Sequence, residues 1–71
     1  MPLRNRLKEY RARLNINQQD FGRLVGTSRQ TISLIERGDY SPSVTLALKI
    51  AKALDARVED VFVYEEGEHE E

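Results

Sequence analysis

The sequence predicts an all-α fold, and two observations carry this prediction. Apolar residues recur at spacings of three and four through most of the chain, which is the period of an amphipathic helix. Glycine, proline and small polar residues suited to helix ends separate these stretches. Five helical segments are therefore predicted, near residues 2–13, 17–25, 28–36, 43–54 and 58–62.

Composition excludes several classes of function. The 71-residue chain has the length of one small domain, which buries only about 60% of the surface that its unfolded chain exposes. The absence of cysteine excludes disulfides, thiolate metal sites and a thiol nucleophile. The single histidine, His69, stands among carboxylates that do not preform a metal site, and no serine lies in an activating motif. We therefore expect no enzymatic activity, metal, cofactor or small-molecule ligand.

Charge is distributed unevenly along the chain. Residues 1–54 hold ten Lys and Arg against four acids, a balance of +6, whereas residues 55–71 hold Arg57 against eight acids, a balance of −7. A basic body can attract phosphates even though the net charge of the chain is −1. Neither a signal peptide nor an apolar run long enough to span a bilayer is present, so we expect a cytoplasmic protein without membrane contact.

The segment that begins at Asn17 has the pattern of a capped amphipathic helix. Asn17 can accept hydrogen bonds from the free amides of the first turn, and Asp20 follows three residues later as in a capping box. Phe21, Leu24 and Val25 recur at spacings of three and four, which predicts that these three side chains share one buried face.

Two glycines and a hydroxyl residue define the turn that follows. Gly22 offers no side chain at a point where another helix could approach closely. Gly26 can adopt the left-handed conformation without a Cβ penalty, so the chain can reverse there. Thr27 or Ser28 then supplies the hydroxyl cap of the next helix. The sequence thus predicts two short helices joined by a tight turn.

The second helix of this pair has one polar side. Ile32 and Ile35 face inward by helical periodicity. The opposite side or its edges carry Arg29, Gln30, Ser33, Leu34 and Arg37. Arginine can bond bidentately to guanine, glutamine can bond to adenine, and an apolar side chain can contact the thymine methyl group. Taken alone, the stretch fits equally well the solvated polar face of any amphipathic helical hairpin.

The remaining helices are expected to supply the core. In the first, the apolar residues that repeat on the core side are Leu3, Leu7, Tyr10 and Leu14. Ser43 can cap the fourth helix, which follows a loop at Pro42. The apolar residues of this helix cover more than one face, which predicts that it packs between neighbours; they are Leu46, Leu48, Ile50, Ala51 and Leu54.

The pattern from Leu3 to Phe62 resembles the Cro/CI-type helix-turn-helix family, also called XRE-like regulators. The resemblance is carried by the stretch INQQDFGRLVGTSRQTISLIERG, the turn SPS, and LALKIAKAL followed by VEDVF. It implies a compact, lambda-repressor-like five-helix bundle over residues 1–64 whose second paired helix, about 28–36, enters the major groove. Residues 65–71 are then an acidic tail, which has too little apolar surface to order itself.

The resemblance also implies which residues meet double-stranded DNA. Base edges are expected to contact Ser28, Arg29, Gln30 and Leu34, of which Leu34 departs from the polar residue often found at its position. Phosphates are expected to contact Gln18, Arg37 and Arg11.

Two further residues carry structural roles by the same resemblance. Arg11 is expected to form a partly buried ion pair with Glu36 at the end of the reading helix; the alternative is two unrelated surface charges. Asn15 stands where the family usually has glycine, and asparagine tolerates the left-handed turn required there.

The C-terminal end is expected to mediate dimer formation. Arg57 stands where the family usually has a Ser or Thr cap, so the fifth helix should fray at its start. The last helix and the residues after it often form the dimer contact in this family, which places Val63 and Tyr64 at a two-fold homodimer interface. The alternative is that these two side chains fold back onto their own domain.

The favoured functional hypothesis is a sequence-specific transcriptional regulator that binds a near-palindromic operator as a dimer. A second hypothesis keeps the fold but makes the protein the antitoxin or controller of a two-gene system. A third is a protein-interaction module that has lost DNA binding, against which the exposed Arg29 and Gln30 argue.

Overall fold

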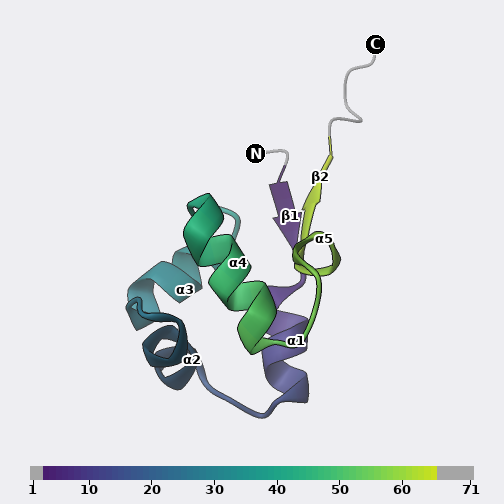
Figure 1. The fold of residues 1–71 in the computed structure, drawn as a ribbon. Helices are drawn as coiled ribbons and strands as arrows, with labels where there is room; N and C mark the ends of the chain where they lie inside the picture. Colours follow the sequence, from purple (N-terminus) through teal and green to yellow (C-terminus); the bar gives the residue numbers. More distant parts are fainter. Residues whose placement is uncertain (1–2, 66–71) are drawn as a thin grey trace.

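The computed structural model describes residues 3–65 as a bundle of short helices with a small sheet at one side (Figure 1). The elements in chain order are β1 (Leu3–Asn5), α1 (Leu7–Arg13), α2 (Gln18–Val25), α3 (Arg29–Glu36), α4 (Val44–Ala53), α5 (Val58–Val61) and β2 (Phe62–Tyr64). Every helix within this part of the chain is too short to cross a bilayer. Most of the predicted acidic tail, including His69, lies outside the described residues.

A two-stranded sheet corrects the all-α prediction. The strands β1 and β2 run antiparallel, with Leu3 opposite Tyr64 and Asn5 opposite Phe62. The first helix therefore begins at Leu7 and not near residue 2, because the preceding residues are extended and pair with the other end of the chain. The fifth helix likewise ends one residue before Phe62, whose backbone is already extended.

Asn5 marks the point where β1 gives way to α1. Its side-chain oxygen accepts a hydrogen bond from the Leu7 amide at 3.1 Å, which satisfies one of the free amides at the start of α1. Its side-chain Nδ2 donates to the backbone carbonyl of Ile35 in α3 at 2.8 Å. One side chain thus joins the sheet, the first helix and the end of α3.

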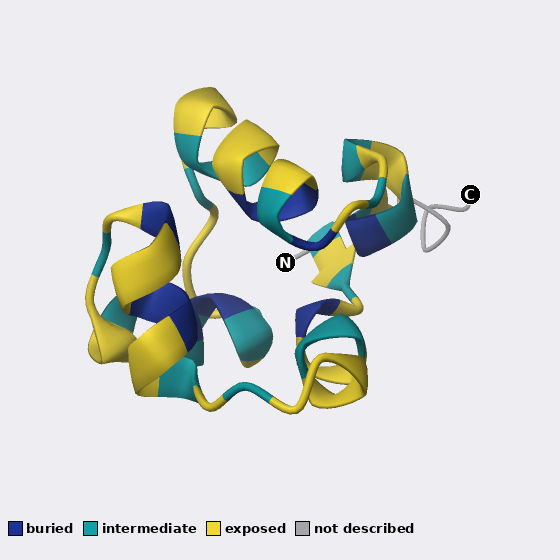
Figure 2. Ribbon diagram, turned by 60° about the horizontal axis from the view of Figure 1, so that its bottom comes forward, coloured by how far each residue is buried: buried dark blue, intermediate teal, exposed yellow. Residues whose placement is uncertain are grey.

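The core gathers where the helices face one another (Figure 2). Its buried side chains are Leu7, Phe21, Val25, Ile32, Ile35, Ile50, Leu54 and Val61. Three leucines predicted to face the core do not, since Leu14, Leu24 and Leu48 are each at least half exposed. In α4 the buried positions lie toward one side of the helix, so it is less enclosed than predicted.

The predicted helix caps are present. The side chains of Asn17 and Ser43 accept from backbone amides three residues later, at 2.8 and 3.1 Å. Ser28, the second of the two candidates, caps α3. Asn15 adopts the left-handed conformation with φ of 58°. At α5 the Asp60 carboxylate accepts from the Arg57 amide at 3.2 Å, which compensates for the missing Ser or Thr cap.

Candidate nucleic-acid interface

The junction of α2 and α3 fixes where α3 begins. Gly26 ends α2 in the left-handed conformation with φ of 80°, and the chain reverses there. A Cβ atom placed on Gly22 would lie 3.0 Å from the backbone oxygens of Thr27 and Ser28, a distance that real Cβ contacts do not tolerate easily. The backbone of the turn therefore packs directly on α2, and this close approach requires glycine at position 22.

The two faces of α3 differ sharply in burial. Ile32 and Ile35 are fully or almost fully buried in the core. Arg29 and Gln30, in the first turn, are exposed, and neither side chain has a hydrogen bond or ion pair with any residue from 3 to 65. Leu34 is half-buried at the edge of this face. The first turn therefore presents an unoccupied guanidinium and an unoccupied amide to the solvent.

Ser28 is already engaged within the helix. Its hydroxyl oxygen accepts from the Thr31 amide at 3.0 Å, and its hydroxyl proton is donated to the Thr31 hydroxyl oxygen at 3.0 Å. The side chain is exposed but retains only acceptor capacity for another group. Its main role in the structure is thus to cap α3.

A largely buried ion pair holds the other end of α3. Nε and Nη2 of Arg11 donate to the two carboxylate oxygens of Glu36 at 2.8 and 3.2 Å, and the side chains are only 14% and 6% exposed. Nη1 of Arg11 donates to the carbonyl of Ile16 at 2.9 Å. The guanidinium therefore joins α1, the loop before α2 and the last residue of α3 through a bidentate pair.

This pairing changes what Arg11 can do at a DNA surface. Three of its donor groups are occupied, and its side chain is mostly covered. Two N–H donors remain, but a phosphate can approach them only through the small exposed part of the side chain. The Arg11 geometry thus supports the ion-pair expectation and argues against the phosphate expectation.

Gln18 and Arg37 lie at the ends of the two helices. Nε2 of Gln18, at the start of α2, donates to Glu36 at 3.1 Å and thereby adds a third donor to that carboxylate. Arg37 follows the last residue of α3 and pairs with Asp39 at 3.2 Å, but both side chains are about 60% exposed. An exposed pair of this kind is weak, so the Arg37 guanidinium stays accessible to an anion.

Sequence reasoning missed two of these contacts. It did not anticipate that Gln18 bonds to Glu36, or that Asn5 bonds to the Ile35 carbonyl. The available signal for Asn5 was an asparagine in a segment predicted to be helical, since this residue favours caps and turns. Gln18 offered no such signal, because a glutamine at the start of a helix is ordinary.

Val63 and Tyr64 lie on β2. They were expected either to form a dimer contact or to fold back onto their own domain, and their positions share features of both. Their backbones pair with β1, opposite Arg4 and Leu3, so the chain does return to its own domain. Their side chains nevertheless stay 40% and 64% exposed. Glu65, the first residue of the predicted tail, pairs with Arg4 at 2.9 Å.

A family model and a curated relative both identify this chain as similar to helix-turn-helix proteins. A family model described as helix-turn-helix matches residues 7–61. The HTH-type transcriptional regulator YgzD of Bacillus subtilis (strain 168) is 52% identical over 64 residues, which cover 90% of this chain and 97% of that protein.

Two solved structures have a similar fold. The P22 c2 repressor, crystallised with a synthetic operator, has a TM-score of 0.74 at 33% identity, covering 76% of this chain and 82% of its own. The restriction-modification controller protein C.AhdI of Aeromonas hydrophila has a TM-score of 0.72 at 33% identity, covering 78% and 83%.

Proposed function

Because this chain belongs to the Cro/CI-type family of helix-turn-helix transcriptional regulators, a DNA-binding class without enzymatic activity, we propose that it recognises a specific operator through α3. The observation that carries this proposal is the contrast between the two faces of α3. Arg29 and Gln30 are exposed and unpaired within residues 3–65, on a helix whose other face is buried. A rigid helix with free polar groups suits base recognition in the major groove.

Three side chains are proposed to read bases. Arg29 suits the two acceptors of guanine, and Gln30 suits the donor and acceptor of adenine. Leu34, half-buried at the edge of the same face, suits the methyl group of thymine. Ser28 stands at the margin, where its remaining lone pair can accept from a base amino group.

Phosphate contacts are proposed for Gln18 and Arg37, which flank the reading face. Gln18 is the first residue of α2, so its backbone amide lacks a helical partner and adds to the donors of its side chain. Arg37 offers an exposed guanidinium at the far end of α3. We assign Arg11 to holding Glu36 and not to a phosphate, since three of its five N–H donors are occupied and its side chain is only 14% exposed.

Selection of bound sequences from a random duplex pool, repeated at two salt concentrations, tests this function. We expect one enriched near-palindromic site with half-sites about one helical turn apart, and affinity that falls as salt rises. Failure to enrich any sequence, with the same salt slope on all duplexes, would contradict sequence-specific recognition.

Dimer formation is proposed to use the exposed side chains of β2. Val63 and Tyr64 expose their side chains on β2. The edge of β2 that does not face β1 can pair with a strand of a second copy. Analytical ultracentrifugation of Val63→Asp should give monomers, whereas Leu14→Asp, at a half-exposed leucine away from β2, should dimerise like the unchanged protein. If Val63→Asp still dimerises, the interface lies elsewhere and the recognition proposal is unaffected.

A controller or antitoxin role is a second candidate, which the similarity to the controller protein C.AhdI supports. A nuclease or toxin gene next to this one, together with repression of that gene pair by this protein, would support it. The third candidate, an interaction module without DNA binding, requires that no duplex binds in a salt-sensitive manner.

A further inference from the structure

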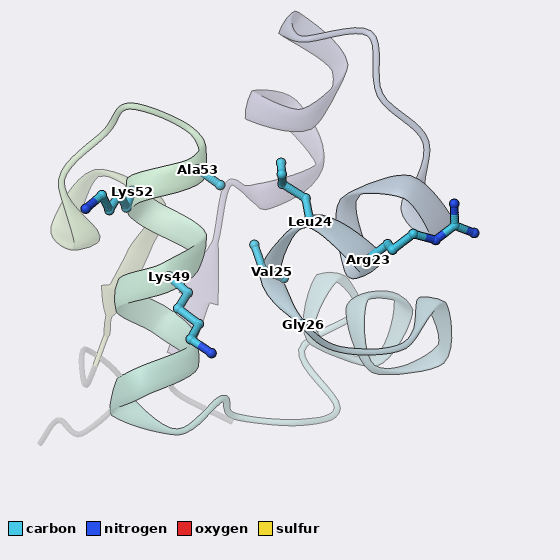
Figure 3. A pocket seen from close by; sticks show the side chains of 7 residues that line it. All are labelled: Arg23, Leu24, Val25, Gly26, Lys49, Lys52 and Ala53. Atoms are coloured by element: carbon cyan, nitrogen blue, oxygen red, sulfur yellow. The ribbon is translucent and has the colours of Figure 1, made fainter.

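An open groove lies between α2 and α4 (Figure 3). Residues 23–26 line it on one side, and Lys49, Lys52 and Ala53 line it on the other. Its volume is about 440 Å³, within the range of sites that accept the side chains of a ligand. None of the residues proposed to contact DNA is among those that line it.

The middle of the groove is apolar. Figure 3 shows Ala53 of α4 pointing toward Leu24 and Val25 of α2. Leu24 is 60% exposed although the adjacent Val25 is buried, so a large apolar side chain stands at the groove without a neighbour that covers it. Gly26 has no side chain to narrow the end of the groove, where the Lys49 ammonium would lie 3.9 Å from an added Cβ. A ligand that covers Leu24 gains from removing this surface from water.

The rim of the groove is positively charged. Arg23 lies on the α2 side, and Lys49 and Lys52 lie on the α4 side. The two lysines have no ion pair with any residue from 3 to 65, and Arg23 meets Asp20 only at 3.8 Å with both side chains mostly exposed. No acidic residue is among the described residues that line the groove. Three cations therefore lie along the outer edges of an apolar surface, with their charged ends pointing outward for Arg23 and Lys52 (Figure 3), and within residues 3–65 only Arg23 has a carboxylate nearby.

We propose that this groove binds an acidic amphipathic helix of a partner protein. Apolar side chains spaced three or four residues apart on that helix cover Leu24 and Ala53, and carboxylates beside them meet Arg23, Lys49 and Lys52. The apolar contacts supply affinity, and the charges supply orientation and speed of association. The regulator would thereby hold a second protein at its operator.

Two other occupants fit the groove less well. In a two-fold dimer built on this groove, the cations of one copy would face those of the other, which is unfavourable. The acidic stretch after Glu65 contains glutamates, one glycine and one histidine, so it has no apolar side chain with which to cover Leu24. DNA phosphates match the charge but not the apolar surface.

An NMR titration of the full ¹⁵N-labelled chain tests the proposal with a defined probe. The probe is a synthetic helix of about four turns with leucines along one face and glutamates on both sides of that face. A peptide of the same composition, with its leucines distributed around the helix, is the control. We expect saturable shifts of the amides at residues 23–26 and 49–53 with the first peptide only.

Matched variants separate the two sources of affinity. Leu24→Ala should raise the dissociation constant of the peptide about tenfold or more. The double variant Lys49→Glu with Lys52→Glu should do the same. A change of this size is well outside the error of the titration. Leu14→Ala and Lys8→Glu, at exposed positions of the first helix region, should leave it unchanged. Circular dichroism of each variant confirms that it is folded.

Three results would overturn the proposal. The first is the absence of saturable shifts up to about 1 mM peptide, which would mean a dissociation constant weaker than about 1 mM. The second is equal binding of both peptides, which would indicate charge attraction alone. The third is displacement of the peptide by a saturating duplex, which would assign Lys49 and Lys52 to a phosphate contact.

Discussion

The two ends of α3 are held in different ways. At the C-terminal end, Glu36 accepts from Arg11 of α1 and Gln18 of α2, and the Ile35 carbonyl accepts from Asn5 of β1. At the N-terminal end, the described contacts are local, because Ser28 caps its own helix and the turn packs on α2. Three elements thus hold one end, while the other end presents its side chains to solvent.

The difference suggests a division of labour within one short helix. A helix that is held at its C-terminal end loses little conformational entropy when its first turn binds DNA. Less of the binding free energy is therefore spent on ordering the helix. Free donors at the near end, in turn, need no internal bond to break before they meet a base. The eight-residue helix α3 is therefore held in place at its C-terminal end and offers free donors at its N-terminal end.

The largest effect is expected when the held end is released. Glu36→Ala leaves the nearly buried Arg11 guanidinium without its carboxylate, and we expect a loss of about 3–5 kcal/mol in the free energy of unfolding, measured by urea denaturation. The double variant with Arg11→Ala should recover part of this loss. Near-zero coupling in this cycle would contradict the role assigned to the pair.

An exposed ion pair provides the control for that cycle. Glu9 pairs with Arg6 and Arg13 on the outer surface of α1, where water and salt screen the charges. Glu9→Ala should therefore change the unfolding midpoint only slightly. A large loss there would mean that the method does not separate buried from exposed pairs.

A large effect on binding, without one on stability, is expected at the free end. Arg29→Ala should weaken binding to the selected operator by about 1–3 kcal/mol with little change on random duplexes. Gln18→Ala should weaken binding to all sequences more evenly, as expected of a phosphate contact. Fluorescence anisotropy on both duplexes measures this, and equal losses for Arg29→Ala would remove its reading role.

A smaller effect should follow from loss of the cap at the same end. Ser28→Ala removes the acceptor for the Thr31 amide and should cost about 1 kcal/mol of unfolding free energy. Ser28→Asp should restore the cap and the stability but weaken DNA binding through its negative charge. If Ser28→Asp binds the operator normally, this end of α3 does not approach DNA closely.

The smallest effect concerns pH and lies far from α3. A hydrogen bond from Arg6 holds the pKa of Glu9 below its ordinary value. The pair then stabilises the fold above the pKa that Glu9 has in the unfolded chain, and the contribution is lost as pH falls through the lower folded pKa. Arg6→Gln should make acid unfolding slightly less steep, and an unchanged profile would show that the pair contributes nothing.

Local rules were sufficient to predict the helix ends that carry a side-chain cap or a left-handed turn. Asn17, Ser43 and Gly26 were predicted from their own chemistry, because a cap or a left-handed turn depends on neighbours within three or four residues. The sheet could not be predicted in this way, since Leu3 and Tyr64 pair across nearly the whole chain. Leu3 and Leu7 also keep helical spacing, so periodicity alone favoured a longer helix.

Helical periodicity also failed to predict burial at positions where it depends on which neighbouring helix covers the side chain. Leu24 shares its stripe with Phe21 and Val25, but the neighbouring helices cover only the latter two. The polar face of α3 was easier to predict, because exposed Arg29 and Gln30 opposite buried isoleucines follow from the helical period. What the sequence could not indicate was that Arg11 is enclosed by Glu36 and the Ile16 carbonyl, since these acceptors come from separate segments.

The sheet has a consequence for how the protein forms during translation. Since β2 follows all five described helices in the chain, the ribosome releases it after them, and β1 has no partner until then. The nascent chain can form α2 and α3 early from local contacts. The Arg6 amide has no acceptor until the carbonyl of Val61 is available, so the first strand and the start of α1 are completed only after α5 and β2 have left the ribosome.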